Sequence, residues 1–124
     1  MPRFAILTHD HPFPHWDFLL EAGEACRTWR LLDEPGAGRT VRAKPIAEHR
    51  LHYLTYDGPV SGNRGTVTRW DTGSFEWIAS ETDRVEVELV GERLCGRCTI
   101  AASDFATHDA CVFAAHNAAQ KRKR

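Results

Sequence analysis

The chain has 124 residues, of which 42% are hydrophobic and 27% charged, so it can bury one core and is too short for two ordinary domains. No apolar run approaches the ~18 residues of a membrane span, so we expect a cytoplasmic protein with no membrane partner. The net charge is −1 although residues 121–124 are all basic. The rest of the chain is therefore acidic, which leaves only a local basic groove for a nucleic-acid partner.

Short runs of β-forming residues recur along the whole chain. Residues 84–90 alternate between charged and apolar side chains, the pattern of a half-buried antiparallel strand. Turn sequences such as 35–38 and 61–65 separate the runs. This spacing predicts an all-β, mainly antiparallel fold, either a β-barrel or a sandwich. The expected strands are 3–8, 15–21, 25–32, 51–56, 66–70, 74–79, 84–90, 94–101 and 110–115.

Helical signals are few, and the two candidates, 101–106 and 114–120, are both short. The sequence contains no internal repeat, low-complexity tract or interdomain linker. We therefore expect a single domain over residues 1–118, followed by a solvated basic tail at 119–124.

The stretch from residue 9 to residue 21 concentrates three histidines and two aspartates around one expected strand. Strand side chains alternate, so His15 and Asp17 would share one face while the even-numbered residues of the strand face the core. The turn around the two intervening prolines would bring His9 back as a third ligand. These residues therefore predict a metal site.

Two histidines and one carboxylate suit zinc, manganese or iron, and they leave coordination positions open for water and substrate. Open positions indicate a catalytic site. A phosphate oxygen would favour manganese or magnesium, and the histidines favour manganese or zinc. The expected cofactor is thus a divalent metal, with Mn²⁺ preferred and Zn²⁺ as the alternative.

A second polar cluster occupies residues 48–53. His49 is a candidate general acid or base and Tyr53 a candidate phenolic donor, and on a strand these two would share a face. A structural, hydrogen-bonded role is the alternative for His49.

Three further cations are candidates for contact with a substrate phosphate. Arg42 and Lys44 follow the loop at 35–38, and Arg64 lies in the turn at 61–65. The alternative is that they are solvated loop residues.

The four cysteines are expected to be reduced thiols, because nothing else in the sequence suggests secretion. Cys95 and Cys98 have the spacing of half a zinc knuckle, but no second pair follows them. We interpret them as small apolar residues beside a strand bend rather than as zinc ligands.

The polar and aromatic motifs of the chain form an ordered set. The set comprises His9, His15-Trp16-Asp17-Phe18, Leu20-Glu21, Trp29, His49, Tyr53, Tyr56-Asp57-Gly58, Gly62, Gly65-Thr66-Val67 and Trp70-Asp71-x-Gly73. This set resembles the 3′-phosphoesterase domain of bacterial DNA ligase D, the multifunctional end-joining ligase. The resemblance runs from about residue 4 to about residue 100.

The resemblance implies a compact β-barrel with a manganese-dependent site that trims 3′ ends, removing a terminal ribonucleoside and then the 3′-phosphate. His9, His15 and Asp17 match the family's metal ligands, and His49 and Tyr53 match its catalytic histidine and tyrosine. The implied partners are nucleic-acid 3′ ends. With no ligase or polymerase module attached, any role in end joining is expected to use such repair proteins in trans.

The chain also departs from the family pattern. Leu19 stands where the family has an arginine, Asp33 lies near the position of a family lysine, and Thr8 precedes the first histidine where a basic residue is common. A lost charge-assisted phosphate contact costs about 1.5–3 kcal/mol. We expect Arg42, Lys44 or Arg64 to replace it, and Leu19→Arg to raise activity.

Three functions fit these observations. The first is a metal-dependent phosphoesterase that processes 3′ ends in DNA repair, favoured by the intact ligand set. The second is a catalytically impaired module that binds metal and DNA ends as a repair accessory protein, favoured by Leu19 and the acidic body. The third is hydrolysis of a small phosphoester, which a preference for mononucleotides over duplex ends would reveal.

Overall fold

The computed structural model describes residues 1–102 and 111–116. In these ranges the chain forms strands and one 3₁₀ turn, η1 (Leu51–Leu54). No helix in the described part is long and apolar enough to cross a membrane. The strands are β1 (Arg3–His9), β2 (His15–Ala22), β3 (Ala25–Leu31), β4 (Thr40–Arg50), β5 (Gly58–Pro59), β6 (Thr66–Ser80), β7 (Arg84–Gly91), β8 (Cys95–Ala102) and β9 (Cys111–Ala115).

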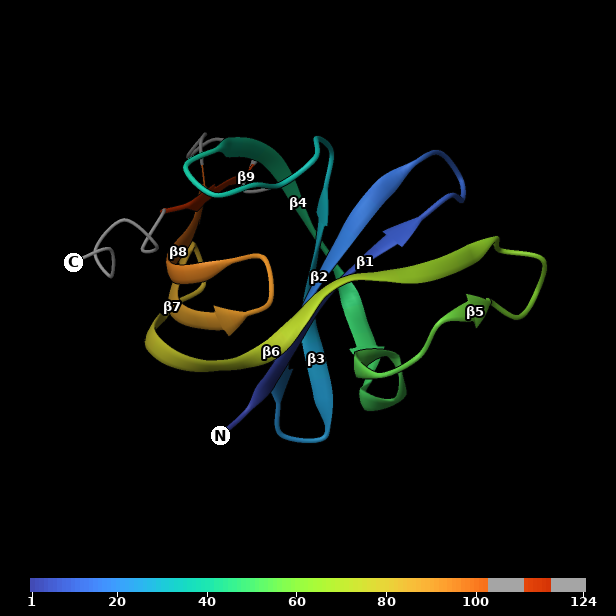
Figure 1. The fold of residues 1–124 in the computed structure, drawn as a ribbon, viewed down its shortest axis with the longest axis horizontal. Coiled ribbons are helices and arrows are strands. Elements are labelled where there is room, and N and C mark those ends of the chain that lie inside the picture. Colours follow the sequence, from blue (N-terminus) through green and yellow to red (C-terminus); the bar gives the residue numbers. More distant parts are fainter. Residues whose placement is uncertain (103–110, 117–124) are drawn as a thin grey trace.

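The sheet closes in a ring (Figure 1). Hydrogen bonds join the strands in the order β1-β2-β3-β4-β9-β8-β7-β6, and β6 returns to β1, with every pairing antiparallel. The short β5 adds to the start of β6. This architecture confirms the expected all-β, mainly antiparallel fold class.

The long strand β6 closes the ring because its first part pairs with β1 and its later part with β7. Gly73 lies at the changeover, opposite both Phe4 and Gly91. A Cβ at Gly73 would collide with the carbonyl oxygen of Val90, so the crossing needs glycine here.

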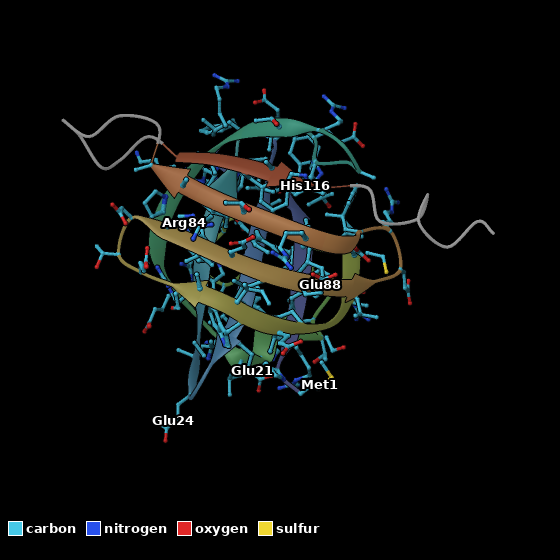
Figure 2. The ribbon with its side chains drawn as sticks, turned by 90° about the vertical axis from the view of Figure 1, so that its left-hand side faces the viewer. Met1, Glu21, Glu24, Arg84, Glu88 and His116 are labelled. Carbon is cyan, nitrogen blue, oxygen red and sulfur yellow. The ribbon has the colours of Figure 1, made fainter. Side chains whose placement is uncertain are left out.

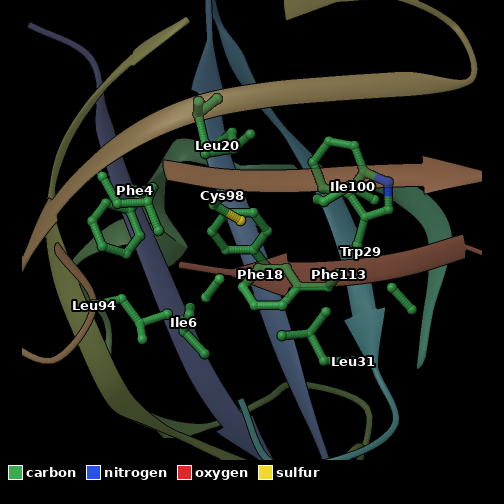
Figure 3. Close-up of a cluster of buried hydrophobic side chains, with 14 of the residues drawn as sticks. Phe4, Ile6, Phe18, Leu20, Trp29, Leu31, Leu94, Cys98, Ile100 and Phe113 are labelled. Carbon is green, nitrogen blue, oxygen red and sulfur yellow. The ribbon is translucent and has the colours of Figure 1, made fainter. Parts of the chain in front are cut away.

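The interior of the ring is an apolar core (Figure 3). Phe18 of β2 is fully buried at its centre, with its ring 5.2 Å from that of Phe113 and 6.0 Å from that of Trp29. Burying each such side chain contributes about 1.5–3 kcal/mol. The even-numbered residues of β2 face this core, as the alternation of the sequence predicted.

A second apolar cluster covers the other face of β1 and β2. Leu54 of η1 packs there with Leu7 and Leu19, which are fully buried. The odd-numbered face of β2 therefore carries the buried Leu19 next to the polar residues His15 and Asp17. The strand expected at 51–56 is wrong. Residues 51–54 form η1, and their apolar side chains cover the outer face of the sheet, so tertiary packing overrides strand propensity.

Strand β4 was not expected, because its exposed cations and Pro45 obscure the alternation. The expected helix at 101–106 is wrong at its start, where residues 101 and 102 extend β8, and the one at 114–120 is wrong at its start, where residues 114 and 115 end β9. Backbone pairing between β8 and β9 accounts for both differences. Residues 103–106 of the first segment, 117–120 of the second and the tail at 119–124 lie outside the described residues.

Asp71 anchors the turn between β7 and β8. Its buried carboxylate accepts hydrogen bonds from the backbone N–H groups of Thr72, Glu92, Arg93 and Leu94, at 2.8–3.0 Å. The motif Trp70-Asp71-x-Gly73 is thus explained by ring closure: the carboxylate fixes one turn and the glycine permits one crossing.

The outer face of β7 and β8 carries a row of ion pairs (Figure 2). Glu86 accepts from Arg84 and from Arg97, each at 2.6 Å, and Arg97 also reaches Glu88 at 3.0 Å. These exposed charges neutralise one another, so this face offers no unopposed basic strip.

Candidate metal centre and adjoining cavity

The three predicted metal ligands lie together on the outer face of β1 and β2. His9, at the end of β1, is directly opposite His15 in the sheet, and Asp17 lies two residues further along β2. One ligand atom from each side chain falls within 4.8 Å of the others. The hairpin between the two strands thus brings the triad together, as the sequence predicted.

His15 is held in one orientation by the loop that precedes it. Its Nδ1 lies 2.7 Å from the carbonyl oxygen of Phe13, which can only accept, so Nδ1 carries the proton. In a neutral ring the opposite atom, Nε2, then presents a lone pair. That atom is buried and lies 3.0 Å from Asp17 Oδ1, yet neither atom has a hydrogen-bond partner.

His9 faces two acceptors. Its Nδ1 lies 3.0 Å from Asp17 Oδ2, and its Nε2 lies 2.9 Å from the carbonyl oxygen of Arg64. Only one nitrogen of a neutral imidazole can donate, so both contacts are satisfied only if the ring is charged or if a cation takes the place of a proton.

Asp17 is only 1% exposed. Burial acts to raise the pKa of its carboxyl group, but the imidazoles of His15, His49 and His9 outweigh this effect and lower the pKa below its usual value. A buried carboxylate that faces three imidazoles attracts positive charge.

The donor set fits a divalent cation. Two imidazole nitrogens and a carboxylate converge, and the orphaned pair His15 Nε2 and Asp17 Oδ1 would both gain a partner from an ion between them. His15 would keep the hydrogen bond from Nδ1 to the carbonyl oxygen of Phe13. Such a bond commonly orients a metal-binding histidine.

His49 and Tyr53 lie beside the triad. His49, near the end of β4, places Nε2 3.9 Å from Asp17 Oδ2, while its Nδ1 is 3.2 Å from the carbonyl oxygen of Ala47. The ring of Tyr53, in η1, lies 5.7 Å from the ring of His49. The two residues therefore lie side by side although Tyr53 is not on a strand.

Both residues line a cavity of about 640 Å³ that also contains His9 and Asp17. Its charged lining side chains include three arginines and two carboxylates. Its lining residues are His9, His11, Pro12, Asp17, Arg30, Ile46, Ala47, Glu48, His49, Arg50, Tyr53, Val60, Ser61, Arg64 and Val67.

The three cations expected from the sequence differ in position. Arg64 lines the cavity, but its guanidinium donates to the carbonyl and hydroxyl oxygens of Ser61 at 2.7 and 3.2 Å. Arg42 is paired with Asp33 at 2.8 Å and is not part of the lining. Lys44 is exposed on β4 and is also absent from the lining.

Sequence reasoning missed two other arginines of the lining, Arg30 and Arg50. Arg30 alternates with the buried residues Trp29 and Leu31 of β3 and so faces away from the core, and this alternation was a usable signal. Placing it beside Asp17 also requires the register between β2 and β3, which composition does not reveal.

Cys95 and Cys98 lie on β8, three residues apart in an uninterrupted register, and so on opposite faces. Cys98 belongs to the core, where burial raises the pKa of its thiol. Shared ligation of one zinc ion by these two side chains is incompatible with this arrangement. The thiol of Cys26, in the second apolar cluster, has its pKa raised to about 11, chiefly by burial.

A closed antiparallel sheet with a histidine–carboxylate cluster and a polar cavity on its outer face defines a small β protein with a candidate metal centre. The chain belongs to the DNA ligase D 3′-phosphoesterase domain family, whose sequence model matches residues 7–102. The matched region holds the triad, His49 and Tyr53.

Curated relatives are similar over most of this chain. The multifunctional non-homologous end joining protein LigD of Pseudomonas aeruginosa is 28% identical over 107 residues, which cover 77% of this chain and 12% of that protein. The multifunctional non-homologous end joining DNA repair protein LigD of Mycobacterium tuberculosis H37Rv is 29% identical over 103 residues, covering 76% of this chain and 14% of that protein. The chain thus spans about an eighth of the length of these relatives.

Proposed function

We propose that this protein is a divalent-metal-dependent phosphoesterase that processes the 3′ ends of nucleic acid in DNA repair. One observation carries the proposal: the triad, His49 and Tyr53 converge beside a single cavity, and all lie within the region matched by the family. The family and the end-joining relatives support DNA ends as the substrate. The proposal places the protein in the cytoplasm, with ligase and polymerase repair proteins as its partners.

His9, His15 and Asp17 would hold the metal, with Mn²⁺ preferred and Zn²⁺ as the alternative. When bound there, the metal would neutralise charge on a phosphoryl oxygen and lower the pKa of a water molecule. Phe13 keeps the proton of His15 on Nδ1, so that Nε2 is available as a ligand. Asp17 lies opposite Leu7 in the sheet, which fixes its position.

His49 and Tyr53, which lie beside the triad, would act on the phosphoester in the same cavity. Ala47 accepts from Nδ1 of His49, which leaves Nε2 directed toward the triad. From there Nε2 can transfer a proton to or from an oxygen of the phosphoester. The phenol of Tyr53 would donate a hydrogen bond to a phosphoryl oxygen.

The test is release of nucleoside and phosphate from a primer-template whose 3′ end is a ribonucleotide 3′-phosphate. The assay is run with Mn²⁺, Zn²⁺ or Mg²⁺ on the wild type, His15→Ala and the control His116→Ala, whose exposed side chain follows β9. We expect metal-dependent release by the wild type and the control, and none by His15→Ala. Absence of release by the wild type with every metal would contradict a phosphoesterase.

A second function is favoured by Leu19, whose side chain is fully buried in the apolar cluster beside the triad. A protein without a cation at this position would bind metal and DNA ends as an accessory module and would not turn over. This function predicts metal binding that His15→Ala removes, together with no release of phosphate by the wild type.

A further inference from the structure

Arg30 lies directly opposite Asp17 across the pairing of β3 with β2. Residues paired in this way point to the same side of the sheet, with Cβ atoms about 4.5–5.5 Å apart. Arg30 also lines the cavity that contains His9, Asp17 and His49. A cation from the neighbouring strand is therefore built into the same face as the candidate metal centre.

The guanidinium group of Arg30 has no carboxylate partner within salt-bridge distance among residues 1–102 and 111–116. Its Nε is buried and lacks a hydrogen-bond acceptor. A buried N–H group without an acceptor is unfavourable, so the side chain is suited to an anion that enters the cavity.

Phe13 fixes the position of this cation. The guanidinium carbon of Arg30 lies 5.4 Å from the centre of the Phe13 ring, a favourable cation–π arrangement. The carbonyl group of Phe13 accepts the hydrogen bond from His15 Nδ1. One loop residue thus positions both a candidate metal ligand and the neighbouring cation.

Arg50 also lines the cavity, but its guanidinium carbon lies 5.7 Å from the centre of the Tyr53 ring, and it is not paired with Asp17 across the sheet. Two other arginines are engaged elsewhere. Arg64 donates to the oxygens of Ser61, and Arg42 donates to Asp33 on the exposed side of β4. Leu19 faces the triad's side of β2, but it is one row away, opposite Thr28, and is packed in the apolar cluster.

We propose that Arg30 binds the terminal phosphate of a 3′-phosphorylated nucleic-acid end, in place of the arginine whose position Leu19 occupies. This inference rests on the proposed function, because it assumes that the phosphate is presented to the triad. A guanidinium presents two parallel N–H groups that match two phosphate oxygens, and its charge persists at any physiological pH.

The test is a binding measurement that does not depend on turnover. Two labelled DNA duplexes are compared by fluorescence anisotropy in the presence of Mn²⁺: one ends in a 3′-hydroxyl group, the other in a 3′-methylenephosphonate, in which carbon replaces the bridging oxygen and prevents hydrolysis. The proteins are the wild type, Arg30→Gln, Arg30→Lys and the control Arg27→Gln. Arg27 is on the same strand but contacts Ser80 and Trp29, outside this cavity.

We expect the wild type and Arg27→Gln to bind the phosphonate end more tightly than the hydroxyl end. Arg30→Gln should lose about ten- to a hundred-fold of this preference, and Arg30→Lys should keep part of it, because lysine retains the charge but not the paired donors. Circular dichroism establishes that each variant is folded.

An unchanged preference in folded Arg30→Gln would overturn the inference, and so would a wild type that does not distinguish the two ends. Failure of the proposed function gives a different result. The wild type would then release no phosphate from the hydrolysable substrate. It would still prefer the phosphonate end, and Arg30→Gln would still lose that preference.

Discussion

Nε2 of His15 faces Oδ1 of Asp17 at 3.0 Å in a buried position where neither atom has a hydrogen-bond partner. Because Phe13 fixes the proton of His15 on Nδ1, the two facing atoms are both acceptors in the neutral ring. Two such atoms repel each other unless positive charge lies between them. Either a second proton on Nε2 or a bound cation would supply that charge, and this argument is independent of any resemblance to other proteins.

The first prediction follows from this pair. Mn²⁺ or Zn²⁺ should stabilise the folded protein, because the ion binds the native arrangement and not the unfolded chain, by about 2.7 kcal/mol at a free metal concentration one hundred times the Kd. Thermal unfolding of the wild type, His15→Ala and the control His116→Ala measures the effect. We expect Tm to rise with metal for the wild type and the control only. A wild-type Tm that neither ion moves would refute the metal site.

The second prediction concerns Asp71, whose carboxylate accepts four backbone N–H groups at 2.8–3.0 Å. Asp71→Ala should destabilise the fold by at least about 3 kcal/mol, because it leaves several buried donors without acceptors. The control is Asp57→Ala, which removes an exposed acceptor from Arg69 and should cost about 1 kcal/mol. Urea unfolding gives both values. An equal loss of unfolding free energy in the two variants would show that the buried hydrogen bonds of Asp71 stabilise the fold no more than the exposed one of Asp57.

The sequence predicted those features that depend on local pattern. The triad was predictable because its members are on two adjacent strands joined by one short loop, so alternation and one turn are enough to place them. The strand at 84–90 was predictable for the same reason.

Other features depend on tertiary contacts that local pattern does not reveal. Residues 51–54 form η1 because they cover the second apolar cluster. Arg30 joins the site only through the register between β2 and β3. Tyr53 was expected from the polar cluster at 48–53 as well as from the resemblance, but its proximity to His49 comes from η1 and not from a shared strand.

The third prediction concerns Asp33 and Arg42. The side chain of Arg42, with help from its backbone N–H, lowers the pKa of Asp33 from the usual 3.8 to about 2. The folded-state pKa lies below the unfolded value, so the stabilising contribution is complete above pH 3.8 and is lost as the pH falls through about 2.

In Arg42→Gln the backbone N–H remains, so the pKa of Asp33 should return part of the way to 3.8. NMR titration of the Asp33 carboxyl carbon measures this pKa in both proteins. Lys44→Gln is the control, because Lys44 is on the same strand and does not contact Asp33 in the described structure. An unchanged pKa in Arg42→Gln would show that Arg42 is not committed to this ion pair and is available to a substrate.

The fourth prediction revises the expected effect of Leu19→Arg. Leu19 is fully buried with Leu7 and Leu54, so an arginine there places a charge in an apolar cluster. We expect Leu19→Arg to lower stability by several kcal/mol and not to raise phosphate release, whereas Leu19→Met should cost less than about 1.5 kcal/mol. Chemical denaturation and the release assay are run together. A folded Leu19→Arg protein with higher activity would restore the original expectation.

The fifth prediction concerns Gly65, which follows the residue whose carbonyl group accepts from His9. Its φ is +82°, and a Cβ there would collide with Asp10 Oδ1 and lie 2.6 Å from Cβ of His11. Gly65→Ala should therefore displace the turn, weaken metal affinity and lower stability by about 1–3 kcal/mol.

Gly38→Ala provides the matched control for Gly65→Ala. Gly38 has a similar φ of +78°, but a Cβ there would meet nothing within 4 Å. Both variants carry the cost of a left-handed alanine, about 1 kcal/mol, so the difference between them isolates the collision beside His9. Calorimetric titration with Mn²⁺ and thermal unfolding measure the two effects. If both variants bind metal as the wild type does, the Arg64 carbonyl does not orient His9 for metal binding.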